Sequence, residues 1–207
     1  MDIKENFLSQ FQAAALPSHI APKTAFITGI TGQCGSYLAE LLLEKGYKVH
    51  GLVMQTVFPE TKWIEQYLKE DRIELHHGDL SDFSSILNAI YKAEPDEIYN
   101  LGAQTHAGNS FFEIEHTLNV TGISVGRVLE AIRIINPKIK MWQASSSEML
   151  GGKLPWNENS SMKGNNPYAC AKIMGHYLIQ NYREAYGIYA VNGIMFNNES
   201  PRRSENF

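Results

Sequence analysis

Three glycines at three-residue intervals, Gly29, Gly32 and Gly35, constrain this chain more than any other feature of its sequence. They follow a short apolar run over 24–28, which predicts a buried strand, and they open an amphipathic segment that predicts a helix over 33–45. In such a unit the first glycine permits a tight turn, the second lets backbone approach a pyrophosphate, and the third lets helix and strand pack closely. The helix N-terminus adds free N–H groups and a favourable dipole. The pattern predicts a dinucleotide-binding loop, with a turn that merely needs glycine as the lesser alternative.

Strand-like and helix-like segments alternate along the rest of the chain. The expected strands are 24–28, 47–53, 73–77, 97–101, 140–144 and 190–194, and the expected helices are 33–45, 61–68, 81–91, 112–135 and 168–186. Such alternation implies parallel strands joined by right-handed crossovers. The predicted fold class is therefore α/β, a doubly wound parallel sheet of the Rossmann type over residues 23–207. Residues 1–22 are expected to form an N-terminal arm, either a short helix or a loose segment.

Composition and charge exclude several classes of protein. With 207 residues and a formal net charge of -4, the chain has no positive field for nucleic acid. Two cysteines, Cys34 and Cys170, are too few for a disulfide framework or a structural zinc site. No metal site is expected, because no histidine pair has helical ligand spacing and His76 and His77 face opposite sides of a predicted strand. No apolar run approaches the ~18 residues of a membrane span, and the N-terminus lacks targeting features, so we expect a cytoplasmic protein.

The residue that reads the adenosine ribose should lie about 20 residues past the glycine loop. No Asp or Glu occurs over 45–59, so the carboxylate typical of an NAD site is missing. No Arg or Lys occurs over 49–61, so the clamp for the NADP 2′-phosphate is missing as well. The residues alone therefore leave the choice of dinucleotide open. Asp79, after the third strand, is either a contact for the adenine or simply an Asp near a helix start.

Tyr168 and Lys172 stand at i and i+4 near the start of a predicted helix, so they share one helix face. A nearby ammonium favours the phenolate, and we expect it to lower the tyrosine pKa toward working pH. Tyr168 is then a candidate acid/base on a substrate hydroxyl, and Lys172 a candidate to hold the nicotinamide ribose. A purely structural pair would be the better interpretation if the glycine loop were absent.

A serine-rich run that ends in Glu148 follows the predicted fifth strand, where open parallel sheets place their ligands. The hydroxyl of Ser146 is a candidate to hydrogen-bond the reacting oxygen beside Tyr168. The carboxylate of Glu148 is a candidate to abstract a carbon-bound proton, which a simple reductase does not need. The alternative is a serine-rich turn with a solvated glutamate.

These residues resemble the GDP-mannose 4,6-dehydratase family, within the extended short-chain dehydrogenases/reductases. The resemblance runs from 23 to 207 and rests on segments 29–46, 98–104, 143–148, 168–172 and 181–203, of which 196–203 is the most specific. It implies NADP as cofactor, a GDP-hexose as substrate and a homo-oligomer as a possible assembly. It also implies that the chain matches the N-terminal part of the family, with the C-terminal substrate lobe largely absent.

The resemblance implies a role for each candidate residue. Tyr168 takes the proton of the sugar 4-hydroxyl, with Lys172 beside it, and Ser146, where the family usually has Thr, bonds that oxygen. Glu148 removes the C5 hydrogen, water leaves C6, and the product is GDP-4-keto-6-deoxymannose. The implied cofactor-binding residues are Gly29, Thr31, Gly32, Gln33, Gly35, Asp79, Leu80, Leu101, Ala103, Gln104, Tyr168, Lys172 and Arg203.

The chain departs from the family pattern at several site positions. Met54 and Gln55 stand in place of the two Arg that read the NADP phosphate, although Arg203 matches a family residue near that phosphate. The other departures are Cys34 for Asp, Asn119 for Asp, Leu150 for Tyr and Asn198 for His. NADP stays the first choice, with NAD as the alternative. Competing functions are another sugar-nucleotide epimerase or decarboxylase, and a dinucleotide-binding remnant without activity.

Overall fold

The computed structural model describes residues 21–54, 56, 60–152 and 154–203. The helix or loose segment expected over 1–22 lies almost wholly outside these residues, and so does Gln55. Within the described residues, no helix combines the length and the apolar character needed to cross a bilayer.

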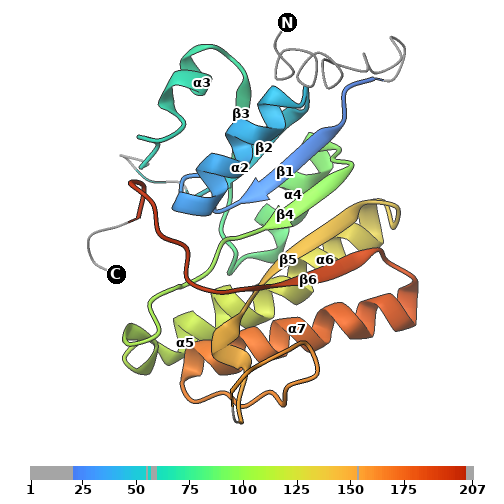
Figure 1. Ribbon diagram of the computed structural model, residues 1–207. Helices are drawn as coiled ribbons and strands as arrows, with labels where there is room; N and C mark the ends of the chain where they lie inside the picture. Colours follow the sequence, from blue (N-terminus) through green and yellow to red (C-terminus); the bar gives the residue numbers. More distant parts are fainter. Residues whose placement is uncertain (1–20, 55, 57–59, 153, 204–207) are drawn as a thin grey trace, which may run out of the picture.

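Six parallel strands form one sheet in the order β3-β2-β1-β4-β5-β6 (Figure 1). The strands are β1 (Thr24–Thr28), β2 (Lys48–Val53), β3 (Ile73–His77), β4 (Glu97–Asn100), β5 (Lys140–Ser146) and β6 (Ala190–Met195). The strand order reverses direction between β1 and β4, which is where doubly wound sheets bind ligands, beyond the carboxyl ends of the strands. The predicted fold class is confirmed.

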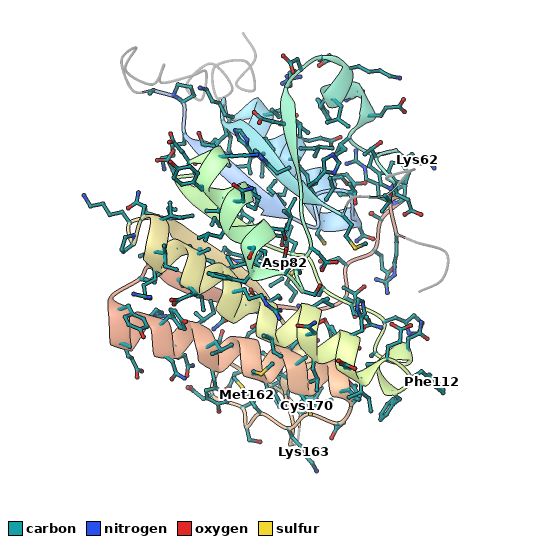
Figure 2. The ribbon with its side chains drawn as sticks, turned by 180° about the vertical axis from the view of Figure 1, so that it is seen from behind. Lys62, Asp82, Phe112, Met162, Lys163 and Cys170 are labelled. Atoms are coloured by element: carbon teal, nitrogen blue, oxygen red, sulfur yellow. The ribbon has the colours of Figure 1, made fainter. Side chains whose placement is uncertain are left out.

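Helices cover both faces of the sheet (Figures 1 and 2). They are α2 (Gln33–Glu44), α3 (Glu65–Lys69), α4 (Phe83–Ala93), α5 (Ile114–Thr117), α6 (Ser124–Ile135) and α7 (Pro167–Tyr186). One apolar core joins the sheet to α4, α6 and α7, with Phe26, Ile98 and Leu129 fully buried in it. A second core joins the opposite face to α2 through Ile27 and Ala39. The apolar positions that predicted these helices are the ones that pack against the sheet.

Several element boundaries differ from the predicted ones. The helix expected over 112–135 begins at Ile114 and contains a π-helical turn, Leu118–Ile123, which inserts an extra residue into the helical repeat. Strand β5 continues to Ser146, so Ser145 and Ser146 belong to the strand and do not follow it. Helix α4 begins at Phe83 because the Asp82 carboxylate (labelled in Figure 2) accepts from the backbone N–H groups of Ser84 and Ser85 at 2.9 and 3.2 Å.

The segment after β6 runs back across the carboxyl edge of the sheet to α2 (Figure 1). Arg202 anchors it by an ion pair with Glu40 at 2.6 Å and a hydrogen bond to the Ser36 hydroxyl at 3.1 Å. The guanidinium also stacks on Tyr37, 3.9 Å from the ring centroid. The bonds of Arg202 therefore hold this segment beside the helix that follows the glycine loop, on the other side of the sheet order from β6.

Candidate functional site

The glycine loop has the geometry that its spacing predicts. Gly29 has a φ of +70°, and a Cβ there would lie 2.9 Å from the Gly102 nitrogen. A Cβ on Gly35 would collide with the carbonyl oxygen of Gly29 and lie 2.8 Å from the Ile30 Cα. Gly32 is the N-cap of α2 and has no side chain to bond the first N–H groups of that helix. These groups are free to bind an anion.

A cavity of about 370 Å³ opens at the carboxyl ends of β1 to β4. Six of the residues expected to bind a cofactor line it: Gly29, Thr31, Asp79, Leu80, Ala103 and Gln104. The Asp79 carboxylate accepts from the Ser81 backbone N–H at 2.7 Å, and this bond lowers its pKa, so the group is charged. The Gln104 Oε1 is buried without a partner in the described part of the chain. A backbone cradle, a shaped cavity and an unpaired buried acceptor fit a dinucleotide.

Seven other residues expected to bind a cofactor do not line this cavity: Gly32, Gln33, Gly35, Leu101, Tyr168, Lys172 and Arg203. Gly32 is the N-cap of α2, and Gly35 packs against the backbone of Gly29 and Ile30. Gln33 donates from Nε2 to the Asn198 carbonyl at 2.9 Å, and Arg203 donates to the same carbonyl at 2.8 Å. Arg203 also pairs with Glu199 at 3.0 Å. The two side chains therefore hold the segment after β6 against the loop.

The lining also includes Val53, Met54 and Thr56, which stand at the expected ribose-reading position, and four residues that sequence reasoning missed: Leu52, Glu60, His116 and Val120. Thr56 and Glu60 lie on the loop after β2, and Glu60 is one residue beyond the segment 45–59, which contains no Asp or Glu. His116 and Val120 come from α5 and the π-helical turn. No local pattern marks them, because only the packing of the helix over β4 brings them to the cavity.

The four candidate catalytic residues, Ser146, Glu148, Tyr168 and Lys172, meet where β5 ends and α7 begins; we call this group the β5–α7 corner. It lies at the same carboxyl edge of the sheet as the cavity, one strand further along, because β5 is the neighbour of β4. Cys170, between Tyr168 and Lys172, points away and is exposed beside the loop residues Met162 and Lys163 (Figure 2). The i, i+4 spacing thus places the tyrosine and the lysine toward the site.

A buried chain of hydrogen bonds connects the two halves of the site. The Thr28 hydroxyl donates to Asn100 at 2.6 Å, and the Asn100 amide donates to Gln143 at 2.7 Å. The Gln143 amide donates to the carbonyl of Ala144 at 3.0 Å, and Lys172 Nζ donates to the same carbonyl at 2.8 Å. The chain crosses β1, β4 and β5 and fixes the lysine. Sequence reasoning missed it because its members are adjacent only across strands.

The protonation of the β5–α7 corner differs from the expectation. Burial raises the pKa of Tyr168 above its ordinary value, a hydrogen bond from Ser146 opposes this, and the charge of Glu148 reinforces it. Lys172 Nζ lies 5.6 Å from the centroid of the Tyr168 ring. The expected lowering by the ammonium was wrong for this structure, because desolvation of the phenol dominates. Burial also lowers the pKa of Lys172 to about 8.

Glu148 is exposed at the mouth of the corner, in the 3-10 turn Ser147–Met149. Its backbone N–H donates to the Ser146 hydroxyl at 3.2 Å, and its carboxylate accepts from Asn166 Nδ2 at 3.3 Å. Asn166 is the N-cap of α7, where its oxygen accepts from the Ala169 N–H at 2.7 Å. One side chain therefore caps the helix and orients the carboxylate. An Asn just before Pro167 is a helix-start signal that points to this residue.

Side chains of helix α6 and of the π-helical turn hold the loops over the cavity in place by hydrogen bonds. Arg127 donates to the carbonyls of Leu80 and Asn119 and to the Asn119 side chain, at 3.0, 3.1 and 2.7 Å. The Gln104 N–H donates to the Thr121 hydroxyl at 3.1 Å. Asn119, where the family resemblance expects Asp, thus acts as an acceptor for Arg127, a role that both side chains can fill.

A family model described as GDP-mannose 4,6 dehydratase matches residues 26–207 of this chain. The chain belongs to this family. It is 47% identical to the GDP-mannose 4,6-dehydratase of Vibrio cholerae serotype O1, over 89% of this chain and 52% of that protein. It is 46% identical to the human GDP-mannose 4,6 dehydratase, over 88% of this chain and 52% of that protein. The chain thus spans about half the length of the curated relatives it matches.

Solved structures of more distant proteins share the fold of this family member. A dTDP-glucose 4,6-dehydratase from Streptomyces venezuelae with NAD and TYD bound matches with a TM-score of 0.80 at 20% identity, over 89% of this chain and 59% of that one. A UDP-glucose 4-epimerase from Thermotoga maritima matches with a TM-score of 0.78 at 18% identity, over 87% and 58%. At these identities the likeness bears on the fold alone.

Proposed function

We propose that this chain supplies the dinucleotide-binding and catalytic half of a GDP-mannose 4,6-dehydratase, a lyase that forms GDP-4-keto-6-deoxymannose. The proposal rests chiefly on one observation. The β5–α7 corner and the cavity of the glycine loop share the carboxyl edge of one sheet, and the corner includes a carboxylate beside the Ser–Tyr–Lys set. A dehydratase needs that extra base, whereas a plain dehydrogenase does not.

Two residues of the corner, Tyr168 and Glu148, carry out the proton transfers in this proposal. A nicotinamide dinucleotide, which the glycine loop and the cavity lining would hold, would supply the acceptor and donor for a hydride. Tyr168 must first lose its own proton to solvent, because burial raises its pKa, and the hydrogen bond from Ser146 favours the resulting phenolate. The phenolate then accepts the proton of the 4-hydroxyl, and Ser146 hydrogen-bonds the 4-oxygen. The 4-ketone acidifies the C5 hydrogen, which Glu148 removes while water leaves C6. Lys172, fixed on the Ala144 carbonyl, keeps a positive charge beside the phenol ring.

The described cavity lining favours NAD over NADP as the dinucleotide. The lining contains the carboxylates of Glu60 and Asp79 and neither Arg nor Lys. A 2′-phosphate needs a cationic partner, while a ribose 2′-hydroxyl suits a carboxylate. Met54 lines the cavity where the resemblance expects Arg, and Arg203 bonds Asn198 and Glu199 outside it. NADP, the first choice from the resemblance, stays a prediction that a titration decides.

Turnover of GDP-mannose tests the proposed function. The purified chain is incubated with GDP-mannose and each dinucleotide, and the sugar nucleotide is followed by mass spectrometry. We expect a product lighter by one water, with no net reduction of the dinucleotide. GDP-mannose left intact with both dinucleotides would refute the substrate assignment.

The Glu148→Gln variant separates a dehydratase from an epimerase. An epimerase that works only through oxidation and reduction at C4 should keep its activity, because it needs no base at C5. A dehydratase should lose product formation by about 100-fold or more, as expected for removal of a general base. Dinucleotide binding without turnover in the native chain would instead support a binding protein without activity.

A further inference from the structure

Two histidines and a glutamate come together on the β2–β3 edge of the sheet, away from the proposed active site. The parallel register pairs His50 of β2 with Glu74 of β3, and His76 follows two residues later on the same face. His50 Nδ1 and His76 Nε2 are 2.9 Å apart. The Glu74 carboxylate lies 3.7 Å from each of these nitrogens. In the described part of the chain, this is the only group of three such side chains close enough to share a metal ion.

From this geometry we propose that His50, Glu74 and His76 bind a divalent transition-metal ion such as Zn²⁺. Zinc accepts imidazole and carboxylate ligands at about 2.0–2.2 Å in a tetrahedral arrangement. Bonds of that length place neighbouring ligand atoms about 3.3 Å apart. The two nitrogens are 2.9 Å apart, and each lies 3.7 Å from a different Glu74 oxygen, Oε2 for His50 and Oε1 for His76. A rotation of the exposed Glu74 side chain brings a carboxylate oxygen within ligand distance of an ion held by both nitrogens. Three protein ligands leave a fourth position for water.

The burial of the three side chains suits a metal ligand set open on one side. The His50 and His76 side chains are 12% and 7% exposed, whereas Glu74 is 66% exposed, which leaves a path from solvent. The two rings stack with centroids 5.2 Å apart, and His76 also packs 5.9 Å from Phe26. The imidazoles are therefore held in place before an ion arrives.

Burial favours the neutral form of both imidazoles, the form that binds a metal. Burial lowers the pKa of His50, with Glu74 opposing and His76 and Lys48 reinforcing the shift. Burial likewise lowers the pKa of His76, with Glu74 opposing and Lys92 of α4 reinforcing it. In the metal-free pair one ring donates its N–H to the other; on metal binding that proton moves to the ring's other nitrogen, and both facing nitrogens become ligands. The positive charges of Lys48 and Lys92 oppose the binding of a cation, and the negative charge of the Glu74 carboxylate offsets them.

Sequence spacing does not reveal this site. The only adjacent histidines in the sequence are His76 and His77, and their side chains face opposite sides of β3. His50 and His76 are 26 residues apart and meet only through the β2–β3 register. An ion here would link the edge strand β3 to its neighbour β2. The site lies just before the ends of these strands, where Leu52, Val53 and Gly78 line the cavity.

A metal titration of the full chain tests the proposal. Tag-free protein is stripped with a chelator and titrated with Zn²⁺ in competition with a chromogenic chelator, and thermal unfolding is followed with and without Zn²⁺. We expect one Zn²⁺ per chain and a higher unfolding temperature in its presence. His76→Gln should weaken binding by about 10-fold or more and abolish the thermal shift. His77→Gln, on the same strand but facing away, should bind as the native chain does.

Two further measurements keep the test decisive. Glu74→Gln changes a largely exposed side chain, so it should fold normally and still weaken Zn²⁺ binding, even if His76→Gln does not fold. Co²⁺ in place of Zn²⁺ should give a tetrahedral spectrum without thiolate charge-transfer bands. Absence of saturable binding, unchanged binding in Glu74→Gln, or thiolate bands from Cys34 or Cys170 would overturn the proposal.

Discussion

The glycine loop and the β5–α7 corner lie on the same edge of the sheet, but they are held in place differently. The loop depends on backbone contacts within a few residues of one another: the carbonyl of Gly29 leaves no room for a Cβ on Gly35. The corner depends on side chains from three strands, ending at the bond from Lys172 to Ala144. The residues that fix the loop are therefore close together in the sequence, whereas the residues that fix the corner are far apart in it.

The largest effect is expected in the glycine loop. Gly35→Ala places a methyl group against backbone that has no side chain to yield, so it should lower the free energy of unfolding by about 3 kcal/mol. Urea unfolding measures this change. Gly126→Ala is the matched control, because its Cβ would lie at an ordinary 3.5 Å from Leu178 and alanine favours a helix. Equal destabilisation of both variants would contradict the backbone argument.

The next effect concerns the buried lysine at high pH. The pKa of Lys172 is about 8 when folded and 10.5 in its ordinary state, so the unfolded chain binds more protons between these values. Stability from this group should therefore rise with pH from about 8 to 10.5, by up to roughly 3 kcal/mol.

Urea unfolding of Lys172→Met across this pH range tests the prediction. The variant should lack this rise relative to the native chain, whereas Lys138→Met, an exposed control, should keep it. A native pH profile in the Lys172→Met variant would show that the lysine is not desolvated.

A smaller effect is expected in the middle of the polar chain. Asn100→Ala removes the acceptor of the buried Thr28 hydroxyl proton and the donor to the Gln143 amide oxygen. The variant should lose about 2 kcal/mol of stability. It should also lower activity, because Gln143 no longer steadies the Ala144 carbonyl that holds Lys172. Asn181→Ala, on the exposed face of α7, should leave both stability and activity unchanged; a harmless Asn100→Ala would show that the relay does not position the lysine.

The smallest effect on stability is expected at the two helix N-caps, Asn166 and Asp82, and a comparison of their variants shows whether Asn166 also positions Glu148. Asn166→Ala and Asp82→Ala each remove an N-cap, from α7 and α4, and each should cost about 1 kcal/mol. Only Asn166 also bonds Glu148, so only its loss should lower kcat with GDP-mannose while KM changes little. Equal kcat values for the two variants would mean that the contact with Glu148 has no part in catalysis.

The sequence predicted what depends on neighbouring residues. All six strands, helix α2 and helix α7 followed from apolar spacing, and the φ of Gly29 and the crowding at Gly35 followed from the loop motif. It failed where distant segments decide the outcome. The π-helical turn over Leu118–Ile123 shifts the face of a helix that reads as regular, and pairing with β6 extends β5 through Ser146. The pKa of Tyr168 was misjudged because spacing shows the lysine but not the burial of the phenol.

A fluorescence titration with NADH and NADPH tests most directly whether the cavity of the glycine loop is a dinucleotide site. The native chain should bind NADH saturably and more tightly than NADPH, because Glu60 and Met54 line the cavity where a phosphate would need a cation. Ala103→Leu, which fills part of the same cavity, should weaken binding of both. Absence of saturable binding, or unchanged binding in Ala103→Leu, would contradict the account.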